Sequence, residues 1–334
     1  MTPTPLTPHL QTATGGSHPS LEAVLHALLR SIGRTAEALR GAHSVTQAGT
    51  DNVFGDAQLN VDVQAERAFR DEIASCPAIV AASSEEDPEE RSKAGGDGDG
   101  SNSDGNDDDD DDVYAVAFDP LDGSSIIAPN WSVGSIVGVW AGRTALRRDP
   151  RAQVAAVLGV YGPRTTAIVA VRVPGREAHA VCLEVAVDEL GGRDIVRAGL
   201  ALRAEGAVAR YFAPANLRAA AEDARYMALV THFVSARYTL RYSGGLVPDV
   251  VHALVKGHGV YVSPVTARSK AKLRRAFELL PVALVVECAG GAAIDPVDGR
   301  RVLETALGDL GETGGLVCGC VEEVGFVRGA LLGE

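Results

Sequence analysis

A stretch of 26 residues, 87–112, contains no hydrophobic residue except Ala94 and consists mainly of Asp, Gly, Ser and Asn. Such a segment cannot bury enough apolar surface to offset the entropy lost on ordering, so we expect a disordered acidic loop there. The stretch from Glu85 to Asp112 contains fourteen acidic and two basic residues, a net charge of −12. It therefore carries all but one of the thirteen net negative charges of the chain. The remainder is nearly neutral, which excludes a general basic face for nucleic acid.

The rest of the chain is long enough for a substantial core, since 334 residues with 46 % hydrophobic content suit one large domain or two joined ones. We expect a flexible tail over 1–19, an N-terminal half over 20–200 and a C-terminal half over 201–334. No apolar run approaches the roughly 20 residues of a membrane helix. The first 20 residues contain neither Lys nor Arg, which argues against a leader peptide. We expect a cytoplasmic protein, or a chloroplast one if a transit peptide is missing from this sequence.

Apolar periodicity indicates a mixture of strands and helices. β-branched and aromatic residues predict strands over 113–118, 133–140, 154–160 and 165–173, the last two joined by a turn at 161–164. Helical spacing predicts helices from Leu21 to Gly41, with Ser20 as N-cap, and over 61–75, 246–256 and 269–280. Residues 282–287 either prolong the last helix or turn to strand. This mixture indicates an α/β or layered α+β architecture.

Three short acidic motifs lie where the chain is expected to turn. They are Gly55-Asp56 with Asp62, Ser84-Glu85-Glu86 after the apolar run 79–82, and Asp119-Pro120-Leu121-Asp122-Gly123-Ser124-Ser125 after a buried strand. Taken alone, each motif is typical of an ordinary turn or of a solvent-exposed strand end. Together, at the ends of strands, they favour a functional site.

The third motif carries the clearest chemistry. We expect Asp119 to end a strand and Pro120 to fix a turn, so that Asp122 returns to the same side with the Leu121 carbonyl between the two carboxylates. Gly123 and Ser124 then offer backbone N–H groups to a phosphate. Carboxylate and carbonyl oxygens suit Mg²⁺, with Mn²⁺ as an alternative. The motif thus predicts metal-assisted hydrolysis of a phosphate ester.

These motifs resemble those of the fructose-1,6-/sedoheptulose-1,7-bisphosphatases, within the lithium-sensitive sugar phosphatase superfamily. The resemblance runs from about residue 21 to about residue 329 and also includes Lys272-Leu273-Arg274 with Glu278. It implies a fold of alternating helix and sheet layers, two or three Mg²⁺ ions per subunit, and a homodimer or homotetramer.

The resemblance also implies a role for each matching residue. The implied metal ligands are Glu85, Glu86, Asp119, Asp122, Glu278 and the Leu121 carbonyl. The residues implied to orient or deprotonate the attacking water are Asp56, Asp62 and Glu86. Those implied to bind the phosphates and the sugar are Gly123, Ser124, Asn216, Arg241, Tyr242, Lys272 and Arg274, with Arg241 reaching into a neighbouring subunit's site.

Within this family, the amino-acid sequences of residues 161–166 and 238–250 resemble the sedoheptulose branch more closely than the fructose branch. This predicts hydrolysis of the 1-phosphate of sedoheptulose 1,7-bisphosphate; fructose 1,6-bisphosphate, alone or in addition, is the alternative. The stretch His43–Val53 lacks the cysteine pair of the plant enzymes, and no AMP-binding turn is recognisable after Ser20. An alternative from another functional class is a binding protein without catalytic activity, which would recruit a basic partner through its acidic loop.

The acidic loop connects Glu85-Glu86 to the strand that carries Asp119. This order predicts that both ends of the loop lie beside the metal site. We expect a solvated tether that influences catalysis only through its charge at low salt.

Overall fold

The computed structural model of the chain describes residues 6–55, 57–92, 112–146, 149–188, 194–203 and 205–333. The greater part of the predicted acidic loop, 93–111, lies outside the described residues. Within them, no helix is both long and apolar enough to cross a membrane.

Two β-sheets form the framework of the described part of the chain. The first has eight strands in the order β10-β9-β8-β7-β6-β5-β3-β4, antiparallel except for the parallel pair β3 and β5. Its strands are β3 (Ile79–Ser84), β4 (Arg91–Ser92), β5 (Tyr114–Asp122), β6 (Val133–Ala141), β7 (Gln153–Tyr161), β8 (Thr165–Val171), β9 (Val181–Ala186) and β10 (Asp194–Arg197). The predicted strands over 133–140, 154–160 and 165–173 and the turn between the last two are therefore confirmed.

The second sheet has the order β12-β11-β13-β17-β15. Its strands are β11 (Tyr211–Pro214), β12 (Thr239–Leu240), β13 (Val260–Ser263), β15 (Ala292–Ile294) and β17 (Leu316–Gly319). Two short pairs complete the strands: β1 (Gln47–Asp51) with β2 (Ala57–Leu59), and β14 (Leu273–Arg274) with β16 (Thr313–Gly314).

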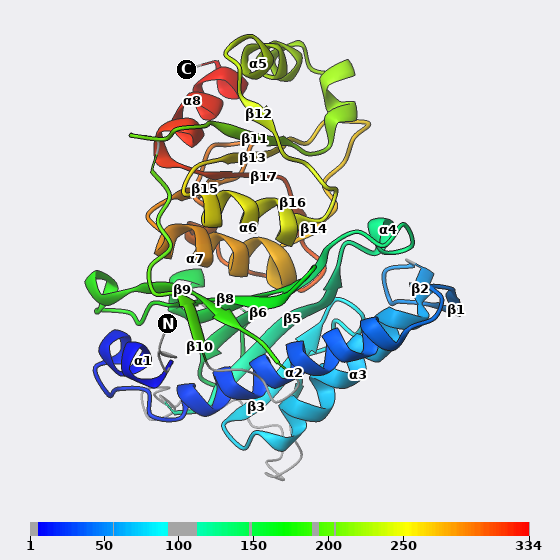
Figure 1. Cartoon of the computed structure of the whole chain (residues 1–334), viewed down its shortest axis with the longest axis vertical. Helices are drawn as coiled ribbons and strands as arrows, with labels where there is room; N and C mark the ends of the chain where they lie inside the picture. Colours follow the sequence, from blue (N-terminus) through cyan, green and yellow to red (C-terminus); the bar gives the residue numbers. More distant parts are fainter. Residues whose placement is uncertain are drawn as a thin grey trace.

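Helices cover both sheets and separate them, which gives five alternating layers (Figure 1). The helices α2 (Leu21–Gly41) and α3 (Asn60–Ser75) pack on one face of the first sheet. The helices α6 (Leu246–Lys256) and α7 (Leu280–Cys288) lie between the sheets, and α5 (Ala224–Ser235) and α8 (Val321–Leu332) form the outermost layer. The predicted layered α/β architecture is confirmed.

The short helix α1 (Thr7–Thr14) contradicts part of the predicted flexible tail. Leu6, Leu10 and Ala13 are buried, and the Arg176 guanidinium donates hydrogen bonds to the Thr12 and Ala13 carbonyls at the end of the helix. Apolar residues spaced by three and four place one face of this helix against the sheet. The prediction over 1–19 is therefore wrong for residues 6–19.

The predicted disordered loop over 87–112 is also wrong at its first residues. Arg91 and Ser92 pair with Ala82 and Ala81 as the antiparallel edge strand β4, and the Glu90 carboxylate accepts hydrogen bonds from Thr144 and Ala145. At the other end of the segment, Asp112 accepts the backbone N–H and the hydroxyl of Ser20 at the start of α2.

These anchors correct the predicted position of the acidic segment. β4 runs antiparallel to β3, so the chain leaves it at Ser92, opposite Ala81, and it enters β5 at Tyr114, opposite Ile79. Both ends therefore lie at the amino ends of β3 and β5, whereas Asp119 lies five residues along β5, about 17 Å away at 3.3 Å per residue. The predicted loop therefore begins beside the second motif, where the Asp87 N–H donates to the Ser84 hydroxyl, but it ends away from the site, and 93–111 is anchored away from the acidic motifs at both ends.

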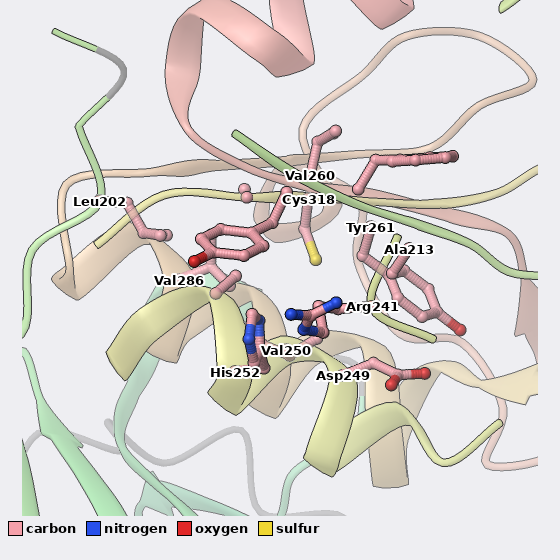
Figure 2. Close-up of a pocket in the computed structure, with 15 residues that line it drawn as sticks. Leu202, Ala213, Arg241, Asp249, Val250, His252, Val260, Tyr261, Val286 and Cys318 are labelled. Atoms are coloured by element: carbon pink, nitrogen blue, oxygen red, sulfur yellow. The ribbon is translucent and has the colours of Figure 1, made fainter. Parts of the chain in front are cut away.

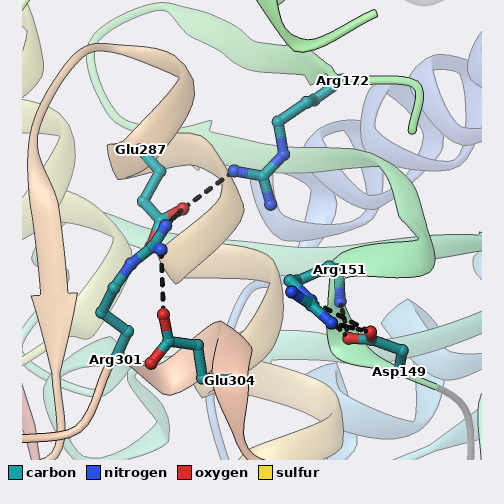
Figure 3. Close-up of polar contacts among 6 residues, drawn as sticks. All are labelled: Asp149, Arg151, Arg172, Glu287, Arg301 and Glu304. Carbon is teal, nitrogen blue, oxygen red and sulfur yellow. Dashed lines mark hydrogen bonds and ion pairs between the residues drawn. The ribbon is translucent and has the colours of Figure 1, made fainter. Parts of the chain in front are cut away.

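The expected helix over 269–280 begins later than predicted. Residues 273–274 form β14, and a π-helical turn η5 (Arg275–Leu279) leads into α7, which continues to Cys288. Near the end of α7, Glu287 binds Arg172, which follows β8, and Arg301, which also binds Glu304 (Figure 3). This half-buried cluster ties the middle helical layer to the first sheet.

Candidate active site

A β-bulge brings two carboxylates of the third motif together. Asp119 pairs with Ile136 and Asp122 with Gly134, so three steps along β5 match two along β6. In a regular strand, residues three apart point to opposite faces; one extra residue in a bulge returns Asp122 to the side of Asp119. Pro120 has no N–H to donate, which a bulge tolerates. The predicted turn after Asp119 is thus a bulge within a strand that continues to Asp122.

Three buried carboxylates form the centre of the site. Oxygen atoms of Asp119, Asp122 and Glu278 lie within 4.8 Å of one another, and all three residues are buried. Burial raises the pKa of Asp119 and of Glu278 well above the usual range, and the charge of Glu85 raises both further. Burial also raises the pKa of Asp122, to about 6.

Backbone N–H groups partly compensate this concentration of negative charge. Asp122 accepts hydrogen bonds from the N–H groups of Leu246 (3.1 Å) and Val247 (2.7 Å) in the first turn of α6. Asp119 accepts from the Leu121 N–H at 2.9 Å, and Glu278 accepts from the Arg274 N–H. The positive end of the α6 dipole therefore stabilises Asp122, which accepts two hydrogen bonds from the first turn of this helix.

The π-helical turn η5 presents Glu278 to the cluster. It spans 275–279, and π-turns occur frequently at functional sites because the extra residue changes the direction of the side chains. The neighbouring Arg275 is buried and pairs with Glu312 at 3.2 Å, while its guanidinium donates to the Thr305 carbonyl. These contacts fix the turn that carries Glu278.

Asp62 is a candidate proton acceptor at the start of α3. One oxygen accepts the Leu59 N–H at 2.8 Å, as in a helix capping box, and the other is buried without a hydrogen-bond partner among the described residues. Burial raises the pKa of Asp62 to about 6. Nearby Glu86 accepts a hydrogen bond from the Gln58 amide.

A cavity of about 370 Å³ opens above the carboxylates and collects most of the predicted site residues. Its lining includes Asp62, Glu85, Glu86, Asp119, Leu121, Ser124, Lys272 and Arg274. Gly123, with φ 101°, is the N-cap of the short helix α4 (Ser124–Ile127), and a Cβ there would crowd Val133 and Ile126. A glycine is therefore required where the chain turns toward Ser124.

The Arg274 guanidinium is held by an aromatic face as well as by charge. Its central carbon lies 3.4 Å from the centre of the Phe54 ring, and its Nε is 3.8 Å from Glu85. Phe54 directly precedes the Gly55-Asp56 motif of the N-terminal half, so this stack joins that motif to the C-terminal half. No pattern in the sequence predicts this contact.

Other site residues could not have been recognised from the sequence. Asn52, Ala271 and Thr313 also line the cavity. Asn52 and Ala271 lie within four residues of the predicted site residues Asp56 and Lys272, and this proximity was the only available signal. Thr313 lies in a glycine-rich run with no motif of its own. Ser135 was missed as well: its hydroxyl donates to the Pro120 carbonyl at 2.6 Å, inside the bulge.

Four predicted substrate residues do not line this cavity: Gly123, which directly precedes Ser124, and three that lie elsewhere. The Asn216 amide donates to the Pro264 and Ser269 carbonyls and so holds the loop that leads to Lys272. Tyr242 is exposed on the surface. Arg241 lines a separate, mainly apolar cavity between α6 and the second sheet, beside His252 (Figure 2). Asp56 lies outside the described residues, so its predicted role stays a prediction.

The donor set fits a hard divalent cation. Three carboxylates with raised pKa values in one buried cluster repel one another, and a cation among them would remove that repulsion. Oxygen ligands of this kind suit Mg²⁺ or Mn²⁺ better than softer metals. The cluster could therefore hold a metal ion beside a phosphate-sized cavity lined by Lys272 and Arg274.

A layered α/β fold with buried carboxylates next to cationic side chains defines a candidate metal-dependent site for phosphate esters. Two family models match this chain: "Fructose-1-6-bisphosphatase, N-terminal domain" over residues 9–190 and "Fructose-1-6-bisphosphatase, C-terminal domain" over 206–331. The chain belongs to the fructose-1,6-bisphosphatase family, which confirms the resemblance inferred from its motifs.

Curated relatives include both branches of this family. The chain is 34 % identical over 274 residues to the chloroplastic sedoheptulose-1,7-bisphosphatase of Spinacia oleracea, covering 82 % of this chain and 64 % of the relative. It is 34 % identical over 283 residues to the class 1 fructose-1,6-bisphosphatase of Geobacter sulfurreducens, covering 83 % and 80 %. The chain thus spans less than two thirds of the length of its plant relative.

Solved structures agree with this assignment. A crystal structure of a Toxoplasma gondii protein assigned as a sedoheptulose-1,7 bisphosphatase superposes with a TM-score of 0.84 at 35 % identity, covering 99 % of both chains. The Leishmania major fructose-1,6-bisphosphatase superposes with a TM-score of 0.81 at 24 % identity over all of both chains, a likeness of fold.

Proposed function

We propose that this protein hydrolyses the 1-phosphate of sedoheptulose 1,7-bisphosphate to give sedoheptulose 7-phosphate and inorganic phosphate. The observation that carries the proposal is the cluster of Asp119, Asp122 and Glu278, whose oxygens lie within 4.8 Å of one another below a cavity lined by Lys272 and Arg274. A catalytically inactive binding protein has no need to keep such a costly buried charge cluster.

We propose Mg²⁺ as the ion, two or three per subunit, with Mn²⁺ as the alternative. The ligands would be Glu85, Glu86, Asp119, Asp122, Glu278 and the Leu121 carbonyl. When bound, such ions neutralise charge on the phosphate and lower the pKa of bound water. The Pro120 bulge and the first turn of α6 hold two of these carboxylates in place before any ligand arrives.

In the proposed reaction, Asp62, together with Glu86 and Asp56, orients and deprotonates the attacking water. The second oxygen of Asp62 is buried without a partner among the described residues, so it can accept a hydrogen bond from a water in the cavity. Its pKa of about 6 leaves it ionised at neutral pH yet basic enough to take a proton.

The anionic substrate meets cations on one side of the cavity. We propose that Gly123, Ser124 and Arg274 hold the phosphate that is cleaved, and that Lys272, Tyr242 and Asn216 hold the sugar and the second phosphate. Arg241 would serve the site of a neighbouring subunit in a homodimer or homotetramer. A guanidinium offers two parallel N–H donors to a phosphate, which suits this role.

The sugar specificity is tested by comparing two substrates. We expect a higher kcat/KM for sedoheptulose 1,7-bisphosphate than for fructose 1,6-bisphosphate in a phosphate-release assay with Mg²⁺, with inositol 1-phosphate as a control. A higher kcat/KM for fructose 1,6-bisphosphate would instead support the second candidate, which the bacterial relatives favour. Failure to release phosphate from either bisphosphate at any Mg²⁺ concentration would overturn both.

The compartment is proposed as the cytoplasm, with the chloroplast as the alternative, since the plant relatives are named chloroplastic. Imaging a fluorescent fusion of the complete gene product in its own cell would decide between the two.

A further inference from the structure

Arg70, in the second half of α3, contacts the chain both before and after the Glu85-Glu86 pair. Its guanidinium donates hydrogen bonds to the Ala82 carbonyl at 3.4 Å and to the Ser84 hydroxyl at 3.2 Å, and it lies 3.6 Å from the Asp87 carboxylate. The helix α3 packs on β3 and β5 (Figure 1), so this side chain connects the helix to the end of β3. The proposed reaction gives it no role.

The Glu85-Glu86 pair lies in a turn that is closed by hydrogen bonds in both directions. The Ser84 N–H donates to the Asp87 carbonyl at 3.1 Å, and the Asp87 N–H donates to the Ser84 hydroxyl at 3.0 Å. The same hydroxyl donates to the Glu66 carboxylate at 2.9 Å and accepts from Arg70. Because a hydroxyl has one proton to donate and two lone pairs, these three partners fix its orientation.

The Arg70 guanidinium is itself held by several contacts. Its Nε donates to Glu66, one turn earlier on α3, at 2.7 Å. Its central carbon lies 5.3 Å from the centre of the Phe118 ring, and that ring stacks on Phe69 at 5.1 Å. The planar guanidinium carries five N–H donors in a fixed arrangement, so it can bind several acceptors at once, which the compact ammonium of a lysine cannot.

The same contacts reach the strand that carries the third motif. The Glu85 N–H donates to the Phe118 carbonyl at 3.0 Å, and Phe118 directly precedes Asp119. The helix α3 also carries Asp62 in its first turn. The Arg70 side chain therefore joins the three segments whose residues Asp62, Glu85 and Asp119 line the catalytic cavity.

Negative charge opposes the observed shape of the turn. Residues 85–87 are three consecutive acidic residues, and the Glu66 carboxylate reaches the hydroxyl at the start of their turn. Like charges at such short distances repel one another. Arg70 pairs with two of these carboxylates, those of Glu66 and Asp87, and Arg91 of the edge strand β4 also pairs with Asp87, at 3.0 Å.

We propose that Arg70 is a positioning residue that holds the Glu85-Glu86 turn in its metal-binding shape before an ion arrives. Without this guanidinium every proposed ligand is still present, but metal binding must also supply the ordering of the turn, which weakens it. The effect of Arg70 on the turn does not depend on the proposed function; its effect on metal affinity rests on it.

Hydrogen exchange of the metal-free full chain, followed by mass spectrometry, tests the effect on the turn. We expect peptides that cover 84–87 to exchange about tenfold faster in Arg70→Gln than in wild type, because hydrogen bonds to a charged group are lost, with peptides of β6 and β7 unchanged. Arg91→Gln is the matched control: it removes the other guanidinium on Asp87 but leaves Ser84 and its three partners in place. Equal exchange in Arg70→Gln and wild type would overturn the proposal.

A calorimetric titration with Mg²⁺ tests the effect on the metal. In Arg70→Gln the Kd for Mg²⁺ should rise about tenfold, since groups that orient metal ligands typically contribute 10- to 100-fold to affinity. The kcat at saturating Mg²⁺ should stay within about threefold of wild type, because the bound ion then orders the turn. A fall in kcat with an unchanged Kd for Mg²⁺ would overturn the positioning role, as would an equal rise of this Kd in Arg91→Gln.

Two milder variants test the same contacts if Arg70→Gln does not fold. Arg70→Lys keeps the charge but loses the fork of donors, and Ser84→Ala removes the hydroxyl that binds both Arg70 and the Asp87 N–H. Both should raise the Kd for Mg²⁺, and an unchanged Kd in both would overturn the proposal. Failure of the wild type to bind Mg²⁺, with faster exchange of the turn still seen in the variants, would instead contradict the proposed function.

Discussion

Acidic residues gather at both ends of the parallel strand pair β3 and β5, but the two groups differ in burial and in function. At the carboxyl ends, Glu85 and Asp119 line one cavity and Asp122 lies in the buried cluster with Asp119, where burial keeps the pKa values of the two aspartates high. At the amino ends, the chain leaves at Ser92 and returns at Asp112, bracketing a segment that carries most of the net charge. Chemical function follows from where carboxylates are confined, and not from how many there are.

The largest expected effect is that of Asp119→Asn. Removing one carboxylate from the buried cluster should lower kcat by about three orders of magnitude, because metal-assisted stabilisation of the transition state contributes several kcal/mol. Phosphate release from sedoheptulose 1,7-bisphosphate with Mg²⁺ measures it. Asp112→Asn, at the other end of β5, is the control and should change kcat less than twofold. Similar losses in both variants would contradict the contrast between the two ends.

Asp62 should give the next largest effect and a characteristic pH dependence. Only its ionised form can accept a proton, so kcat/KM should rise with pH up to about 6 and then level off. Asp62→Asn should remove this limb and lower kcat about 100-fold. Asp71→Asn, an exposed carboxylate on the same helix, should change neither.

The same raised pKa predicts how the stability of the metal-free protein changes. Because the folded state binds the Asp62 proton more tightly than the unfolded state, this group's contribution makes the free energy of unfolding fall as pH rises from about 4 to about 6. The loss is on the order of 3 kcal/mol above pH 6, and Asp62→Asn should recover most of it. Urea denaturation at pH 5 and pH 8 would show the difference; a variant that is no more stable than wild type at pH 8 would refute it.

Phe54 tests how the catalytic end is assembled from both halves of the chain. Phe54→Ala removes the ring under the Arg274 guanidinium, and since such contacts contribute about 0.5–2 kcal/mol, kcat/KM should fall about 3- to 30-fold. Phe54→Tyr should restore it. Val53→Ala, the neighbouring residue, is 72 % exposed and should have no effect. Equal losses of kcat/KM at the two positions would show that the loop as a whole supports catalysis and that the stack of Phe54 on Arg274 does not contribute specifically.

The smallest effect should come from shortening the acidic segment. Ser92 lies level with Ala115 and the other end enters β5 at Tyr114, so the ends lie about 13 and 17 Å from Asp119 along β5, whereas charges are screened over about 8 Å at physiological salt. Replacing residues 95–110 with a short Gly-Ser linker should leave kcat unchanged and alter kcat/KM less than twofold at 0.15 M salt, with a larger change only at low salt. Loss of activity at every salt concentration would show that the segment belongs to the catalytic end.

Local patterns predicted much of this structure. The strands β6, β7 and β8 are buried almost throughout and were recognisable as continuous β-branched and apolar runs, whereas the helical spacing of α2, α3 and α6 follows from their one buried face. The acidic motifs were recognisable because their residue types suit one chemistry. In α1, by contrast, a Thr- and Pro-rich composition concealed the buried face formed by Leu6, Leu10 and Ala13.

What could not be predicted depends on pairing between distant segments. The bulge at Pro120 is defined only by its register against Ile136 and Gly134. The edge pairing of Arg91 and Ser92 moves the ends of the acidic segment away from the cluster, and nothing in two polar residues indicates it. The stack of Phe54 on Arg274 joins residues 220 positions apart, beyond the reach of any local pattern.

The most direct test of the central claim is a calorimetric titration with Mg²⁺ of three proteins: wild type, Asp119→Asn, and the variant with the shortened acidic segment. We predict that the tightest binding is kept when the segment is shortened and lost in Asp119→Asn, although the segment carries far more charge. Tight binding that survives Asp119→Asn and disappears with the segment would contradict the assignment of the buried carboxylates as the metal site.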